Sequence, residues 1–210
     1  MTRNVEFFFD LGSSASYLAF TQLPALCAQE GARLDWRPML LGGVFQATGN
    51  HSPAIVPAKG LYMQRDFERF AARYGVPFAR NPHFPINTLT LMRCTTAVQM
   101  DAPDRLPEWL ARVYPAIWVE GRNLNDPAVA AEVVGCAGFD AQALLARAGA
   151  SEVKERLKAV TQEAIERGVF GAPTLFVGGE MFWGQDRLDF VREALRFSPP
   201  TPSTTERKTT

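Results

Sequence analysis

A serine at the junction between an apolar run and a helical segment is the first residue whose position suits chemistry. Ser13 follows the apolar run 5–9 and precedes residues with helical spacing. A helix start offers unpaired backbone N–H groups and a partial positive charge, so a hydroxyl placed there can help to stabilise an anion such as a thiolate. The same position is a preferred one for a serine that only caps the helix, and both interpretations stay open at this point.

A proline before a second apolar run also suits a binding site. Pro173 precedes the run 174–177, and because proline cannot donate to a sheet ladder, it belongs at a strand start. A cis bond between Ala172 and Pro173 would turn the preceding backbone outward, towards an extended, peptide-like ligand. The alternative is an ordinary trans proline at a sheet edge.

Strand signals occur only near the two ends of the chain. The predicted elements there are strands at 5–9, 33–40, 174–177 and 181–183, a helix between the first two strands, and a last helix over 186–197. A strand, helix, strand order predicts a parallel pair, and the glycines at 178–179 predict a hairpin. Because distant strands must complete one sheet, the segment between them is expected to be an insertion rather than a tandem domain.

The middle of the chain has helical periodicity. Residues 41–57 carry paired glycines and prolines and are expected to form a loop. Helices are predicted where apolar residues recur on one face, at 63–74, 106–117 and 151–167, and after the Asp126-Pro127 cap signal.

Composition narrows the class of protein. The 210 residues are 47% hydrophobic, enough for one substantial core, and 22 basic residues balance 22 acidic ones. No overall charge therefore favours nucleic acid or an anionic membrane as a partner, and a small molecule is expected instead. Three scattered cysteines and the lack of an apolar leader favour a reducing, cytoplasmic location. Neither His51 nor His83 has metal-ligand spacing, so no metal is expected.

The two junctions together resemble those of the thioredoxin superfamily. More specifically, the chain to about residue 197 is similar to the group of 2-hydroxychromene-2-carboxylate isomerases and kappa-class glutathione transferases. The supporting stretches are 48–50, 57–63, 87–93 and 183–187, in the order in which that group has them. Ser13 and Ser16 stand at the first and fourth positions of a former Cys-x-x-Cys, which excludes dithiol redox chemistry. Ser14 departs from the group, which commonly has proline there.

The resemblance implies an α/β, thioredoxin-like fold with an all-helical domain inserted between an N-terminal βαβ and a C-terminal ββα unit. Residues 1–50 and 168–198 would form the glutathione-binding domain and 51–167 the inserted helical domain. The polar, proline-rich segment 199–210 is expected to be a disordered tail.

The resemblance also implies glutathione as a cofactor and assigns residues to it. Ser13 would hold the thiolate, and the other glutathione-binding residues would be Ser16, Asn50, Lys59, Ala172, Pro173, Gln185, Asp186 and Arg187. Asp186 would pair with the γ-glutamyl ammonium, Gln185 would hold its carboxylate, and the Ala172 backbone would pair with the cysteinyl amide. Asn87 and Arg93 would lie on the substrate side. Plainer roles remain open: Lys59 on the surface, Asn50 in a turn, Asp186 as a cap.

The implied activity is a glutathione-dependent cis–trans isomerisation of 2-hydroxychromene-2-carboxylate to trans-o-hydroxybenzylidenepyruvate, or of an analogue, in aromatic catabolism. One alternative is a kappa-type glutathione transferase, which would keep the sulfur in its product. Another is a redox-dead thioredoxin-fold module that binds a partner chain. An apolar helix face in the insertion would suit a homodimer.

Overall fold

The structure, a computed structural model, describes residues 3–197, so the predicted tail at 199–210 lies outside the described part. Its strands are β1 (Arg3–Phe9), β2 (Ala32–Pro38), β3 (Thr174–Val177) and β4 (Glu180–Trp183). Its α-helices are α1 (Ser14–Gln29), α2 (Leu41–Thr48), α3 (Pro57–Tyr74), α4 (Leu89–Asp101), α5 (Leu106–Trp118), α6 (Pro127–Cys136), α7 (Ala141–Ala148), α8 (Ser151–Glu166) and α9 (Leu188–Phe197). Short 3-10 turns occur at Pro53–Ile55, Pro103–Arg105 and Gln185–Arg187.

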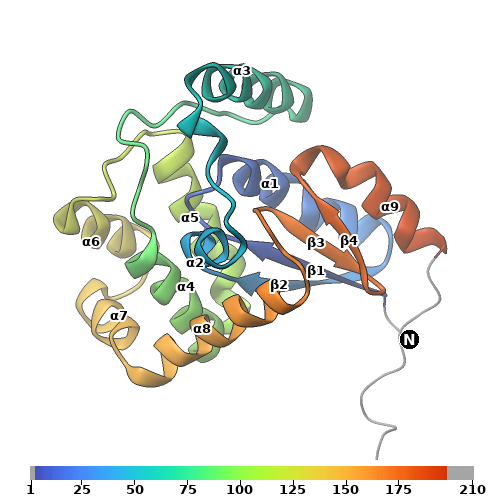
Figure 1. The fold of residues 1–210 in the computed structure, drawn as a ribbon. Helices are drawn as coiled ribbons and strands as arrows, with labels where there is room; N and C mark the ends of the chain where they lie inside the picture. The colour runs from blue at the N-terminus through green and yellow to red at the C-terminus, as the bar shows by residue number, and fades with distance from the viewer. Residues whose placement is uncertain (1–2, 198–210) are drawn as a thin grey trace, which may run out of the picture.

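The strands from the two ends of the chain form one sheet. Their order is β2-β1-β3-β4, with β1 parallel to β2 and antiparallel to β3, and β3 antiparallel to β4. The predicted thioredoxin-like α/β fold is therefore confirmed, with the helices α4 to α7 to the left of the sheet and α3 above α1 in Figure 1. The carboxyl end of β1 and the start of β3 lie next to each other because β1 and β3 are neighbours.

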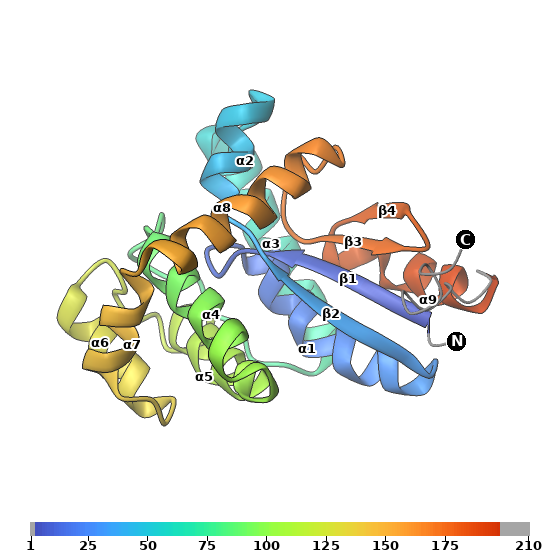
Figure 2. The ribbon, with the colours of Figure 1, turned by 90° about the horizontal axis from the view of Figure 1, so that it is seen from below.

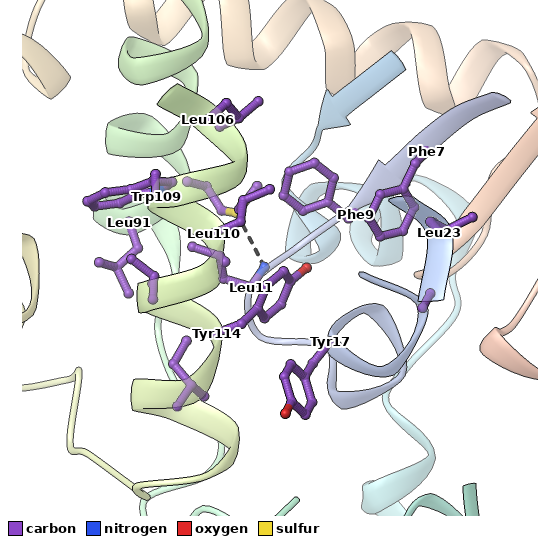
Figure 3. Packing of buried hydrophobic residues seen from close by; sticks show 14 of the residues in the cluster. Phe7, Phe9, Leu11, Tyr17, Leu23, Leu91, Leu106, Trp109, Leu110 and Tyr114 are labelled. Carbon is purple, nitrogen blue, oxygen red and sulfur yellow. Dashed lines mark hydrogen bonds between the residues drawn. The ribbon is translucent and has the colours of Figure 1, made fainter. Parts of the chain in front are cut away.

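The larger core covers one face of the sheet. Strand residues alternate between faces, and Phe7 and Phe9 of β1 point into this core with α1 and α9. Figure 3 shows α5 from the insertion meeting the same side chains: Tyr114 projects from α5 towards Phe9 and Leu11, whereas Trp109 points to the other side of α5, where its Nε1–H donates to the Thr95 hydroxyl. The insertion thus shares its hydrophobic core with the sheet.

A smaller core covers the other face. Phe8 of β1 and Phe176 of β3 pack there with Val44 of α2 and Val160 of α8. Figure 2 shows α2 and α8 on the side of the sheet opposite to α1. Helix α8 packs on the sheet as well as on the helices around it. The expected boundaries of the inserted helical domain, at residues 51 and 167, therefore stay a proposal.

Helix α2 corrects the expectation of a loop over 41–57. Two adjacent glycines disfavour a helix, but tertiary contacts outweigh that local preference. Val44 is fully buried in the smaller core. The Leu41 N–H donates to the Asp10 side-chain carboxyl group over 2.8 Å, so a distant residue supplies an acceptor for one of the N–H groups at the helix start.

The other predicted helices are present, with small shifts at their ends. Asp126 caps α6 by accepting from the Ala128 N–H, and Gly75 ends α3 in a left-handed conformation. The last helix begins at Leu188 rather than at 186, because a 3-10 turn precedes it. Over residues 3–197, no single helix has the length and apolar composition needed to cross a membrane, although α6 and α7 together, as a sharply bent pair, pass that test.

Candidate active site

Ser13 lies at the N-cap of α1, where its hydroxyl makes two hydrogen bonds. Its Oγ accepts from the Ser16 N–H over 3.1 Å, and its O–H donates to the Ala172 carbonyl oxygen over 2.9 Å. Capping therefore uses the oxygen, while the proton points across the sheet to the segment before β3. One hydrogen bond joins two residues that are 159 positions apart in the chain.

The segment before β3 gathers further site residues. The Ala172-Pro173 peptide bond is cis, as the site hypothesis required. The Asn50 side-chain amide donates to the Phe170 carbonyl oxygen over 2.7 Å, and the Gly184 N–H donates to the Pro173 carbonyl oxygen over 3.0 Å. The loops that carry Asn50 and Gly184 thus converge on the neighbours of Ala172.

Asn50 and Lys59 face a common pocket. It has a volume of about 870 Å³, and it runs between the end of α2 and the first turns of α3. Its other lining residues include His51, Tyr62 and Met63, so the wall combines polar ends with an apolar surface. Because Asn50 also bonds to Phe170, the pocket adjoins the segment that Ser13 contacts.

The loop at residues 184–187 packs closely beneath the same segment. Gly184 has φ +108°, and a Cβ there would lie 2.4 Å from Asp186 Oδ1, so only glycine suits this position. Asp186 pairs with Arg187 over 2.6 Å on the surface. The Gln185 carbonyl oxygen accepts from the Tyr74 hydroxyl over 2.8 Å, which attaches the loop to α3. Burial raises the pKa of Tyr74 to about 12, so its proton stays available for this bond.

Three assigned residues lie less directly at the site. The Ser16 side chain is fully buried, so its visible contribution is the N–H that donates to Ser13. Asn87 lies just before α4, where its Oδ1 accepts from the Leu89 N–H over 3.1 Å. Arg93 is half-buried on α4. No hydrogen bond among the described residues joins Arg93 to Ser13.

Two buried polar residues beneath Ser13 were missed by the sequence interpretation. Asp10 directly follows β1 and is 2% exposed, and the buried Thr88 hydroxyl at the start of α4 donates to its Oδ1 over 2.8 Å. The available signal was a single carboxylate placed directly after a run of apolar residues. That pattern alone does not show which donors the carboxylate binds.

The arrangement suits the binding of an anion. The first N–H groups of α1, those of Ser14 and Ala15, have no acceptor among the described residues, and they lie beside the Ser13 hydroxyl. Helix-start amides of this kind stabilise negative charge. Residues 3–197 contain no group of three or more histidine, cysteine, aspartate or glutamate side chains placed to hold a metal ion.

Comparison with known proteins gives consistent results. The profile of the DSBA-like thioredoxin domain matches residues 4–196. A 2-hydroxychromene-2-carboxylate isomerase of Sphingobium xenophagum is 38% identical over 93% of this chain and 99% of its own length. Human glutathione S-transferase kappa 1 is 30% identical over 93% of this chain and 92% of its own.

A comparison with solved structures also finds a protein with the same fold. A solved structure of a 2-hydroxychromene-2-carboxylate isomerase superposes with a TM-score of 0.81 and 30% identity, covering 92% of this chain and 94% of the other. The likeness therefore extends through the helical insertion as well as the sheet. Because the profile spans nearly the whole described chain, this protein belongs to the DSBA-like thioredoxin domain family.

Proposed function

We propose that this protein is a glutathione-dependent isomerase that acts on 2-hydroxychromene-2-carboxylate or a close analogue. Relatives with that name are 32–38% identical over more than nine-tenths of this chain. The proposal assigns glutathione as a cofactor and an aromatic-derived small molecule as the substrate. The cysteine pattern is the reason for proposing a cytoplasmic location, and the apolar helix faces of the insertion are the reason for proposing a homodimer.

The hydrogen bond between Ser13 and Ala172 carries the proposal. Both groups are ones that glutathione would use: the Ser13 O–H to donate to the thiolate, and the Ala172 carbonyl oxygen to accept from the cysteinyl N–H. In the structure the Ser13 O–H donates to the Ala172 carbonyl oxygen over 2.9 Å. Binding would replace this one bond by two, while the Ser13 oxygen would continue to cap α1 through Ser16.

The chain's own groups would hold the thiolate in its charged form. The Ser13 hydroxyl and the N–H groups of Ser14 and Ala15, which have no acceptor among residues 3–197, form a set of donors at the same helix start. When bound, glutathione would supply a thiolate that adds reversibly to the conjugated system, so that the former double bond can rotate before the thiol leaves. The donors at the helix start would stabilise the thiolate both before addition and as it departs.

The remaining assignments follow the two loops around Ala172. Asp186 and Gln185 would receive the γ-glutamyl end, and the exposed Asp186 carboxylate would exchange its Arg187 partner for the ammonium. Asn50 and Lys59 would meet the other polar groups from the pocket between α2 and α3. Asn87 and Arg93 are proposed for the substrate side.

The decisive test compares wild type with Ser13→Ala in glutathione-dependent turnover of 2-hydroxychromene-2-carboxylate, with free thiol counted before and after. We expect conserved thiol, and a fall in turnover of about 10² in the variant, because a preorganised donor is lost. Asp140→Ala removes the N-cap of α7, whose Oδ1 accepts from the Ala143 N–H, and serves as the control for lost capping alone. It should lower stability but leave turnover unchanged.

The outcomes separate the competing functions. Thiol that disappears into product would favour the kappa-type transferase, which the relatives at 30–31% identity make the second candidate. No affinity for glutathione, together with indifference to Ser13→Ala, would leave the redox-dead binding module. Equal losses of turnover in Ser13→Ala and Asp140→Ala would mean that Ser13 acts only as a helix cap.

A further inference from the structure

The buried carboxylate of Asp10 connects three segments around the site. Its Oδ1 accepts from the Gly12 N–H and from the Thr88 hydroxyl, each over 2.8 Å. Its Oδ2 accepts from the Leu41 N–H, also over 2.8 Å. These donors come from the turn before α1, the start of α4 and the start of α2, so one side chain fixes the relative positions of all three.

The turn that presents Ser13 is held by Asp10 at both ends. The Ser13 N–H donates to the Asp10 carbonyl oxygen over 3.1 Å, in addition to the bond from Gly12 to the side chain. The packing is tight: a Cβ on Gly12 would lie 3.1 Å from the Thr88 Cγ2. Thr88 is part of the insertion, so the insertion contacts the Ser13 turn directly through this residue.

The surroundings of Asp10 make its charge depend on these donors. Burial raises the pKa of Asp10, while the hydrogen bonds from Gly12, Leu41 and Thr88 oppose that rise. Within the described residues no cationic side chain is among the influences on it. Tyr114 faces it from α5, and its pKa is raised well above the ordinary value by burial and by the Asp10 charge, so it stays neutral.

We propose that Asp10 is a positioning residue for the reaction: its ionised carboxylate orders the turn that presents Ser13, and Thr88 couples that turn to the helical insertion. The catalytic consequence rests on the proposed function, whereas the ordering of the turn does not. The two parts therefore need separate measurements.

Thr88→Val is the sharpest variant, because it keeps the side-chain shape and removes one donor to the carboxylate. Thr96→Val is its matched control: Thr96 is fully buried on the same helix, and its hydroxyl donates only to the Met92 carbonyl oxygen. Asp10→Asn is a third variant, in which an amide N–H would face one of the three donors. Should Asp10→Asn fail to fold, Thr88→Val still decides the question.

The first measurement is amide hydrogen exchange on the unliganded full chain at neutral pH. Losing a hydrogen bond to a charged group should speed exchange roughly tenfold in the peptide over 10–17 and in the peptide over 40–44. Thr96→Val should leave both peptides at the wild-type rate. Unchanged protection of 10–17 in Thr88→Val, or an equal change in the control, would overturn the ordering role.

The second measurement is the pH profile of glutathione-dependent turnover. Without the Thr88 donor the carboxylate binds its proton more readily, so the acid limb should move upward by about one pH unit in Thr88→Val. Thr96→Val should keep the wild-type limb, and Asp10→Asn should be slow at every pH. If the wild type is active and Thr88→Val has the same acid limb, the catalytic consequence is refuted. A wild type without turnover refutes the proposed function, and the exchange data then still decide the ordering role.

Discussion

At the scale of single residues, the two sequence-based interpretations of Ser13 are compatible. Capping needs a lone pair, which Ser16 uses, and anion binding needs the hydroxyl proton, which points to Ala172. One hydroxyl group can therefore serve both roles, since its oxygen caps the helix and its proton points to the opposite segment. Sequence alone sets the two roles against each other because it does not show where the proton points.

Asp186 allows a test of the glutathione-binding loop at this scale. Asp186→Asn removes the charge proposed to pair with the γ-glutamyl ammonium, and we expect the dissociation constant for glutathione to rise about tenfold. Turnover at saturating glutathione should change little, because the proposed role of Asp186 is to bind the γ-glutamyl end and not to stabilise the thiolate. Isothermal titration calorimetry measures the change, with Glu180→Gln as the control for loss of one exposed carboxylate on β4. Equal affinities of Asp186→Asn and wild type would remove Asp186 from the site.

At the scale of elements, the segment before β3 depends on its contact with β4. A Cβ on Gly171 would lie 2.5 Å from the Trp183 Nε1, so either the indole or the segment must move in Gly171→Ala. We expect a loss of about 1–3 kcal/mol in unfolding free energy, together with weaker glutathione binding. Gly135→Ala in α6 has open space around it and should be neutral or stabilising by up to about 1 kcal/mol. Denaturant titration compares them, and similar effects of the two would disprove the contact.

The existence of helix α2 could not be predicted from its local sequence. Its glycines predicted a loop, but its stability comes from the burial of Val44 and from the Asp10 carboxylate, both of which depend on distant segments. The strands, by contrast, were predicted because aromatic and β-branched runs signal them locally. In the same way, the Asp10 interactions could not be predicted, since its three donors lie in three separate segments.

The glycines of α2 provide a matched pair. Gly49 ends the helix with φ +70°, so Gly49→Ala should cost about 1 kcal/mol and displace the neighbouring Asn50. Gly42 lies in the first turn without a positive φ and with open space around it, so Gly42→Ala should stabilise by about 0.5–1 kcal/mol. Thermal unfolding measures both. A stabilising Gly49→Ala would contradict the left-handed end of α2.

At the scale of the whole molecule, an ion-pair cluster attaches the end of the insertion to the sheet. Arg167, which follows α8, binds both carboxylate oxygens of Glu6 on β1, over 2.7 and 2.8 Å. It also pairs with Glu163 and lies 3.8 Å above the ring of Phe176. Arg37 of β2 pairs with the same Glu163. The cluster covers the smaller core, where sequence periodicity gave no sign that α8 would meet the sheet.

Glu6→Gln tests this attachment through the pH dependence of stability. The hydrogen bond from Arg167 lowers the pKa of Glu6, against the effect of burial. A lowered folded-state pKa contributes stability above the unfolded-state value of about 4.3, and that contribution is lost as pH falls through the folded-state pKa. Because the pair is partly exposed, we expect Glu6→Gln to cost about 1 kcal/mol at pH 7, and the difference from wild type to shrink as pH falls towards 3.

Urea unfolding across this range measures the difference, and Glu155→Gln on the exposed side of α8 is the control, since its pair with Lys158 is long and exposed. The control should stay close to wild type throughout. A cost of Glu6→Gln that is the same at pH 7 and pH 3 would mean that the Glu6 charge contributes nothing, and that packing in the smaller core and of Arg167 on Phe176 joins α8 to the sheet.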